Sequence, residues 1–151
     1  MSEHVRIIYV CSGNICRSPM AEAMTKEMLE ERGRPGVVIS AGTLGIVGRK
    51  PAAFTRRALQ EEGFDPPQTR SQGISPGLLE HADFIPVMEP KHAEHLLGIS
   101  EEFDDKIVRL WHYADEPIER IDDPVGEEIE AFRQTRELLY ECIETWLDSA
   151  L

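Results

Sequence analysis

The amino-acid sequence predicts an α/β fold in which a mostly parallel sheet carries helices on both faces. Two patterns lead to this prediction: short β-branched apolar runs alternate with segments of helical periodicity, and Gly and Pro gather between them. Alternating strands and helices form right-handed crossovers, which make neighbouring strands parallel. Because 151 residues suffice for one buried core, we expect a single domain over residues 1–151.

Four segments have the composition of buried strands. Residues 5–10 are apolar and rich in β-branched side chains, and residues 36–40 repeat this composition. Residues 83–88 are the third candidate, although Pro86 lacks a backbone donor and therefore weakens the strand or places it near the end of the sheet. Residues 106–110 are the fourth candidate.

The first predicted helix has a recognisable start and end. Ser18 is a favourable N-cap residue, and Pro19 suits the first helical position because its missing N–H group has no partner there. Gly33 is expected to end the helix. One face of this helix carries three methionines at four-residue spacing, namely Met20, Met24 and Met28.

Three further helices follow from the pattern. One begins at Pro51 and ends at Gly63, and a short one covers residues 90–97. The last is a long amphipathic helix at the end of the chain. Its apolar residues recur at helical spacing and are Ile129, Phe132, Leu139, Ile143 and Trp146.

The composition narrows the possible partners and location. The chain has 28 acidic and 16 basic residues and a net charge of −12, which argues against nucleic acid or an anionic membrane as a bulk ligand but allows one local cationic pocket. No apolar run is long enough to span a membrane, and the start of the chain lacks the order of a secretion signal. Three cysteines are too few for a disulfide scaffold, so we expect a reduced, cytoplasmic setting.

The loop after the first strand carries the clearest chemical motif, because ligands of parallel sheets bind beyond the carboxyl ends of the strands. Gly13 and Asn14 tolerate the backbone angles of a tight anion cradle, and Arg17 offers a fork of donors for phosphate oxygens. Cys11, at the end of the strand, faces the middle of this positive loop as a thiolate nucleophile, with the Ser18 hydroxyl beside it. The predicted phosphate-binding loop consists of Cys11, Ser12, Gly13, Asn14, Ile15, Cys16, Arg17 and Ser18.

A simpler interpretation of Cys11 is a small buried apolar residue in an ordinary turn between a strand and a helix. A Cys and an Arg at this spacing alone would leave that interpretation strong. Here the Gly-Asn pair, the Ser and the strand–loop–helix context agree with the spacing, so we favour covalent catalysis at phosphorus.

Residues 10–22, with the sequence VCSGNICRSPMAE, resemble the signature of the low-molecular-weight protein-tyrosine phosphatase family, in its bacterial type. Residues 40–43, 82–83 and 122–124 resemble further segments of the same family. The resemblance implies a four-stranded parallel sheet, a cysteinyl-phosphate intermediate, a phosphorylated protein substrate, no metal and no cofactor. We further expect that the protein binds phosphate-like anions and is a monomer.

An Asp-Pro pair late in the chain offers the acid that such a reaction needs. One carboxyl group can protonate the leaving oxygen and later deprotonate the attacking water. Asp123 matches the general acid of the family, and Pro124 holds its loop in one shape. Asp122 remains an alternative at this point, and without the upstream loop the pair would be a solvated turn.

Three polar residues match the hydrogen-bond network with which the family supports its loop: Asn14, Ser18 and Ser40. The chain departs from the pattern at Thr69, where many relatives have His. Ordinary turn and cap chemistry is the alternative for all of them.

Cys16 lies in the same loop as Cys11. Relatives with both cysteines form a reversible disulfide that protects the nucleophile, and a neighbouring thiol can resolve an oxidised one. A buried Cys that packs under the loop is the alternative for Cys16. Cys142 falls on the last helix and is expected in the core.

The walls of the pocket decide the substrate. Ile15 is apolar and bulky and suits an aryl ring, whereas relatives that act on phosphoarginine carry Thr there. Tyrosine phosphatases of the family usually place aromatic residues after the Asp-Pro pair, where this chain has Val125; Leu44, Ile46 and Val47 are candidates for the missing wall. Residues 130–136 resemble the arginine-phosphatase branch. We therefore predict phosphotyrosine as the substrate and keep protein-arginine phosphatase as the alternative.

Other classes of protein fit less well. An arsenate reductase resembles this loop but needs further cysteines, and residues 82–89 contain none. A phosphate-binding module without catalysis would not need the combined Cys, Arg and Asp. His92 and His95 have the spacing of metal ligands, but on a short acidic surface helix we expect them to be solvated.

Overall fold

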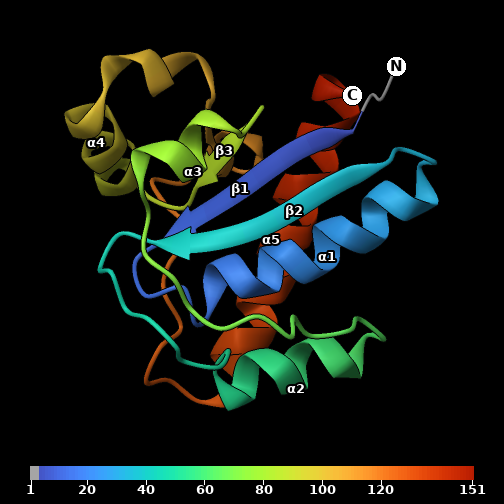
Figure 1. The fold of residues 1–151 in the computed structure, drawn as a ribbon. Helices are drawn as coiled ribbons and strands as arrows, with labels where there is room; N and C mark the ends of the chain where they lie inside the picture. Colours follow the sequence, from blue (N-terminus) through green and yellow to red (C-terminus); the bar gives the residue numbers. More distant parts are fainter. Residues whose placement is uncertain (1–3) are drawn as a thin grey trace.

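The computed structural model describes residues 4–151, so the N-terminal prediction about a secretion signal falls partly on residues 1–3, which lie outside the described part. Within it, all strands run parallel in one sheet with the order β2-β1-β3-β4, with helices on both faces (Figure 1). This confirms the predicted α/β fold. The strands are β1 (Val5–Cys11), β2 (Gly36–Gly42), β3 (Ile85–Val87) and β4 (Ile107–Arg109).

The two long strands determine where the site lies. β1 and β2 pair over their full length, from Val5 opposite Gly36 to Cys11 opposite Gly42, so both end at the same edge. β3 is only three residues long and pairs with β1 at a single position, as expected for a strand with Pro86 at its centre. It nevertheless lies between β1 and β4 rather than at an edge of the sheet.

All four predicted helices are present with shifted ends. The short α3 and the two 3₁₀ segments, which are too brief to leave a periodic pattern, were not predicted. The elements are α1 (Arg17–Glu31), α2 (Ala53–Glu61), α3 (Pro76–Glu80), α4 (Pro90–Ile99), η1 (Glu101–Asp105), η2 (Leu110–Tyr113) and α5 (Ile129–Ala150).

The predicted N-cap of α1 is wrong. The helix begins at Arg17, one residue before Ser18, and its N-cap residue Cys16 makes no side-chain cap hydrogen bond. The Ser18 hydroxyl lies against the Cys11 sulfur, as the loop motif predicted, so the residue contributes to the loop and not to the cap. Gly33 takes a positive φ of 64° just beyond the helix, as expected for its end.

Much of the core lies where α1 packs on β1 and β2 and α5 packs on α1. α5 packs against α1 and α2, and Figure 1 shows α5 passing behind β1 and β2. Trp146 of α5 is buried and meets Tyr9 and Phe84 edge-on. Cys142 is fully buried in the same helix, which confirms its predicted place in the core.

No helix within residues 4–151 is both long enough and apolar enough to cross a bilayer. The longest, α5, has 22 residues but carries charged side chains along its length. In the same part of the chain, no three His, Cys, Asp or Glu side chains come together in a way that could hold a metal ion.

Candidate active site

The loop that follows β1 is short and tightly folded. Cys11 ends β1 and Arg17 begins α1, so residues 12–16 make the whole connection. Asn14 adopts a left-handed backbone with a φ of 60°, which Asn accepts more readily than most residues. A Cβ at Gly42 would lie 2.6 Å from the Ser12 carbonyl oxygen, so only glycine lets β2 approach the loop this closely. The loop opens onto the N-terminus of α1, where the helix dipole favours an anion.

The Cys11 sulfur lies at the centre of the predicted loop. Its Sγ is 2.9 Å from the Ser18 hydroxyl and accepts the backbone N–H of Asn14 at 3.3 Å. Hydrogen bonds to sulfur stabilise the thiolate relative to the thiol, because the charged form is the stronger acceptor. The loop therefore provides donors for the charged form of the nucleophile.

A buried polar network holds Asn14 and brings together the three residues Asn14, Ser18 and Ser40. The Asn14 side-chain amide donates to Ser18 at 2.9 Å and to Ser40 at 2.8 Å. Ser40 in turn donates to Glu22 at 2.7 Å, and the Gln72 backbone N–H donates to Asn14 Oδ1 at 2.9 Å. Every polar atom of the Asn14 amide group thus has a partner, which fixes its unusual backbone.

Two members of this network were not predicted, although one left a signal. Glu22 lies within the signature segment, and its position four residues after Ser18 places it on the same side of α1. Gln72 gives no signal, because its backbone, and not its side chain, reaches Asn14. Within residues 4–151 no hydrogen bond joins Thr69 to this network, and Gln72 of the same segment binds Asn14 through its backbone.

Arg17 is almost fully buried and is held by acceptors on one side only. Its Nη1 donates to Glu89 at 2.5 Å and to the Ile121 carbonyl at 2.7 Å, while Nη2 lies 3.4 Å from Ser12 Oγ and 3.5 Å from Asp123. Its Nε is buried and has no hydrogen-bond partner among residues 4–151. A buried donor without an acceptor is costly, so the guanidinium is arranged to receive an anion.

Glu89 is the main residue that the sequence interpretation missed. Burial raises the pKa of the Glu89 carboxyl, but the hydrogen bond and the charge of Arg17 together lower it by more. The pKa of Glu89 therefore lies below the ordinary value. Glu89 therefore stays charged and balances the buried guanidinium. Glu89 lies between Met88 and Pro90, and neither of these residues indicates a functional site in the sequence.

His92 contradicts the expectation of a solvated histidine, because its side chain is fully buried under the loop. Its Nδ1 accepts the Glu89 backbone N–H at 3.1 Å, so the neutral ring carries its proton on Nε2 and donates it to Ser12 Oγ at 3.0 Å. Burial and the nearby Arg17 lower the pKa of His92 to about 4. His95 is exposed, as expected.

We expect the His92 ring to make folding sensitive to acid. Its pKa is about 4 in the folded protein and 6.5 for the ordinary group, so between these pH values only the unfolded chain binds the proton. The free energy of unfolding should therefore fall by up to roughly 3 kcal/mol as the pH drops from 6.5 to about 4. Below that range His92 should cause no further change. Denaturant titrations at neutral and mildly acid pH measure this.

The matched variants His92→Asn and His92→Gln both remove the titration. Asn keeps an acceptor near Nδ1, and Gln keeps a donor near Nε2, so together they separate the contact with Glu89 from that with Ser12. Both should flatten the dependence of stability on pH relative to the original protein. An unchanged slope in both would mean that other groups cause the acid sensitivity.

The structure separates the two neighbouring aspartates. Asp123 lies 3.5 Å from Arg17 Nη2, accepts the Val125 backbone N–H at 3.1 Å, and has about a third of its side chain exposed (32%). Asp122 is 85% exposed and pairs with Arg120. Pro124 is buried between Asp123 and Val125. Only the Asp123 carboxylate therefore faces the loop.

A small hollow of about 140 Å³ opens above the sulfur. Cys11 and Ser12 lie on its lining, and Asp123 lies on its rim. Its remaining walls are largely apolar and come from three separate segments, with Ile15, Leu44, Ile46 and Val125 among them. Val47, also predicted as a wall, is not among the residues that line the hollow and is largely exposed.

Cys16 is buried and differs sharply from Cys11 in its surroundings. Burial is the main cause that raises the pKa of Cys16 to about 12, and the carboxylate of Asp123 adds to it. Cys16 is therefore a protonated thiol at neutral pH and does not compete with Cys11 for attack on phosphorus. All three cysteines are free in the structure.

A guanidinium whose Nε lacks an acceptor, placed beside a thiol at the positive end of a helix, suits a phosphate group whose phosphorus faces the sulfur. The fold and this arrangement together define the class of cysteine-dependent phosphatases. The family described as low molecular weight phosphotyrosine protein phosphatase matches residues 6–151, so the chain belongs to this family.

Related proteins carry two substrate names. The chain is 33% identical over 137 residues to a protein-arginine-phosphatase of Bacillus subtilis (strain 168), with 91% of each protein covered. It is 34% identical over 137 residues to the low molecular weight protein-tyrosine-phosphatase PtpB of Staphylococcus haemolyticus (strain JCSC1435), with 90% of this chain and 94% of that protein covered. A solved YwlE arginine phosphatase mutant with a phosphorylated active-site serine has a TM-score of 0.88 and 30% identity, with 96% of this chain and 95% of that chain covered.

Proposed function

We propose that this protein hydrolyses phosphotyrosine in protein substrates through a phosphate ester of Cys11. The observation that carries the choice of substrate is the apolar wall of the hollow above the sulfur, formed by Ile15, Leu44, Ile46 and Val125. Leu44 and Val125 are 67% and 53% exposed, so an aryl ring in the hollow would cover apolar surface that now faces water.

In the first step, the phosphate group binds in the loop and accepts hydrogen bonds from Arg17, including its unpartnered Nε. The Cys11 thiolate attacks phosphorus, so the S–P bond forms while the P–O bond to the substrate breaks. Asp123 gives its proton to the leaving oxygen, which departs as the tyrosine hydroxyl. A phosphorylated serine in the active site of the related YwlE mutant supports transfer of phosphate to the enzyme.

In the second step, water attacks the phosphorus of the cysteinyl phosphate. The Asp123 carboxylate takes a proton from this water, the S–P bond breaks, and inorganic phosphate leaves with Cys11 restored as thiolate. The hydroxyl of Ser18, 2.9 Å from the sulfur, stabilises the departing thiolate.

Phosphoarginine is the second candidate substrate, favoured by the similarity to protein-arginine-phosphatases. Part of this similarity, in residues 130–136, has a structural explanation. Arg133 and Arg136 both bind Glu61 of α2, at 2.6 Å and 3.2 Å, so this segment fixes α5 on α2. Its likeness to the arginine-phosphatase branch therefore does not by itself indicate the substrate.

Replacing Ile15 tests the substrate directly. In Ile15→Thr a hydroxyl replaces part of the apolar wall, so we expect kcat/KM for phosphotyrosine peptides to fall about tenfold, the effect of losing roughly one to two buried methylene groups. The ratio of phosphoarginine to phosphotyrosine turnover should rise. Peptides that differ only in the phosphorylated residue supply the measurement. If the original protein already prefers phosphoarginine, the tyrosine assignment fails.

We also propose that Cys16 protects Cys11 from irreversible oxidation. Peroxide converts the Cys11 thiolate to a sulfenic acid, and the Cys16 thiol then condenses with it: the S–S bond forms, the S–O bond breaks, and the thiol proton leaves with the hydroxyl group as water. Peroxide inactivation of the original protein should be reversed by a thiol reductant, whereas Cys16→Ser should recover a much smaller fraction of its own starting activity. Equal recovery of both proteins would exclude Cys16 as the resolving thiol.

A further inference from the structure

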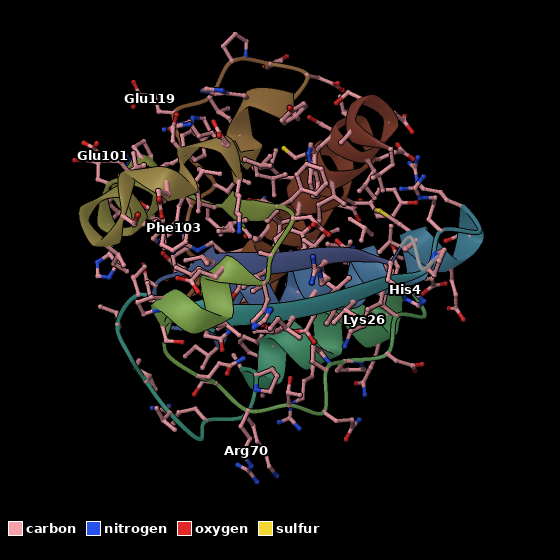
Figure 2. The ribbon with its side chains drawn as sticks, turned by 45° about the horizontal axis from the view of Figure 1, so that its top comes forward. His4, Lys26, Arg70, Glu101, Phe103 and Glu119 are labelled. Atoms are coloured by element: carbon pink, nitrogen blue, oxygen red, sulfur yellow. The ribbon has the colours of Figure 1, made fainter. Side chains whose placement is uncertain are left out.

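The charges of this acidic protein are unevenly distributed. Residues 32–60 contain six basic residues and no acidic one, although the whole chain has a net charge of −12. Figure 2 shows that Arg70, which follows this segment, lies on the opposite side of the molecule from Glu101 and Glu119. We call the surface around Lys50, Arg56 and Arg70 the cationic surface; Arg32 and Arg34 of the same segment lie just before β2 and are not part of it.

A groove of about 250 Å³ lies within this cationic surface. Lys50, Arg56 and Arg70 supply its charge, and Gln60 and Gln68 add amide groups. Three prolines complete the lining, which includes no acidic residue. Because proline backbones are stiff, the groove is largely formed before any ligand enters.

The cations of the groove are free to bind an external anion. Within residues 4–151, no carboxylate lies within 4.0 Å of the charged groups of Lys50, Arg56 or Arg70, whereas neighbouring Arg57 has Glu61 at 3.9 Å. Arg70 donates to the Gly48 carbonyl at 3.1 Å, which holds its guanidinium in place. Cations that are close together and unpaired repel one another, so an anion between them relieves this repulsion.

Both walls of the groove continue into residues that are hydrogen-bonded to the phosphate-binding loop. One wall continues from Pro51 into Ala52, whose N–H donates to the Ile15 carbonyl at 2.8 Å. The other continues from Arg70 to Gln72, whose N–H donates to Asn14 at 2.9 Å. The groove is therefore next to the catalytic loop, and a substrate chain that leaves the hollow can reach it.

We propose that this groove binds acidic side chains of the protein substrate on one flank of its phosphorylated residue. Carboxylates match the three cations and two amides in charge and hydrogen bonding, and the volume suits one or two side chains. A nucleic acid fits less well, because its long polyanionic backbone would also meet the acidic remainder of the surface. This inference rests on the proposed function, since it assigns the sequence context of the same substrate.

The test compares phosphotyrosine peptides that carry either glutamates or glutamines on each flank. We expect the original protein to favour the glutamate form on one flank by roughly five- to tenfold in kcat/KM, because several exposed pairs act together. The preference should shrink as salt rises and screens the charges. Arg56→Gln combined with Arg70→Gln should remove it, and Lys50→Gln combined with Arg56→Gln should do the same without disturbing the Arg70–Gly48 contact.

The control removes two positive charges elsewhere. Arg6 lies at the start of β1 and Arg34 just before β2, at the ends of these strands that point away from the loop. The double variant Arg6→Gln with Arg34→Gln should therefore keep the preference for glutamate. A preference that survives both groove variants, or disappears equally in the control, contradicts the proposal. So does displacement of an acidic peptide by single-stranded nucleic acid at lower concentration than by the peptide itself.

Two readouts separate this proposal from the proposed function. Hydrolysis of a small aryl phosphate, which does not extend to the groove, tests the catalytic loop alone. Binding of a labelled, unphosphorylated glutamate-rich peptide tests the groove alone and should weaken in both groove variants. If the protein binds the peptide but does not hydrolyse the aryl phosphate, the proposed function is wrong. If it hydrolyses the aryl phosphate but does not bind the peptide, the proposed role of the groove is wrong.

Discussion

Replacement of Cys11 by Ser should abolish turnover while leaving the phosphate site intact. A serine hydroxyl is a far weaker nucleophile than a thiolate at neutral pH, so we expect kcat to fall by about 10⁴-fold or more. The oxygen can still accept the Asn14 N–H and meet the Ser18 hydroxyl, the two contacts that the sulfur makes. Arg17 and its partners are unchanged, so inorganic phosphate should bind with similar affinity.

Three measurements check this expectation. Steady-state assays with an aryl phosphate give the loss in kcat, and calorimetric titration with phosphate gives the affinity. Rapid quenching of the original protein during turnover should trap labelled phosphate on Cys11. Catalysis that continues in Cys11→Ser at more than a hundredth of the original rate, or label found on another residue, would require a different nucleophile.

The part of the site that lies within one short segment could be predicted from the sequence. Cys11, Asn14 and Arg17 are joined by a loop between a strand and a helix, so their spacing fixes their arrangement almost independently of the rest of the chain. Ser18 was expected both to cap the helix and to place its hydroxyl beside Cys11, and the structure shows only the contact with the Cys11 sulfur. Local propensity favours the cap, whereas the charge in the loop favours the contact with sulfur.

The part that depends on distant elements could not be predicted in the same way. Glu89 and the Ile121 carbonyl hold Arg17 across separations of 72 and 104 residues, and only the packing of α4 and the Asp-Pro loop brings them there. His92 had one usable signal, because Leu96 lies four residues later and both are buried on one face of α4. Periodicity assigns such a position to the core, but its contact with Ser12 follows only from the fold.

Asp123 was expected from the resemblance, and the structure supplies a physical reason to prefer it over its neighbour. Its carboxylate lies on the rim of the hollow near Arg17, whereas the carboxylate of Asp122 is 85% exposed and bound to Arg120 at 3.0 Å. The two aspartates thus have the same side chain but different surroundings, so each serves as the control for the other. Substituting each by Asn removes one charge at nearly constant volume and tests the assignment.

The loss of activity in Asp123→Asn should depend strongly on the leaving group of the substrate. Tyrosine is a poor leaving group that needs a proton, so kcat for phosphotyrosine should fall by roughly 10²–10³. A nitrophenolate leaves without help, so the first turnover of nitrophenyl phosphate should stay fast. Hydrolysis of the cysteinyl phosphate still lacks its base, and stopped-flow traces should therefore show a burst of nitrophenol followed by slow turnover.

Asp122→Asn should behave like the original protein with both substrates, since its carboxylate contacts only the exposed Arg120. If instead Asp122→Asn shows the dependence on leaving group and Asp123→Asn does not, the acid is Asp122, and the loop must move before catalysis to bring it to the hollow. An equal loss with both substrates in Asp123→Asn, without a burst, would indicate that Asp123 mainly orients Arg17 over the 3.5 Å contact. The burst therefore distinguishes proton transfer from positioning, because only a missing acid–base group slows the second step while sparing the first.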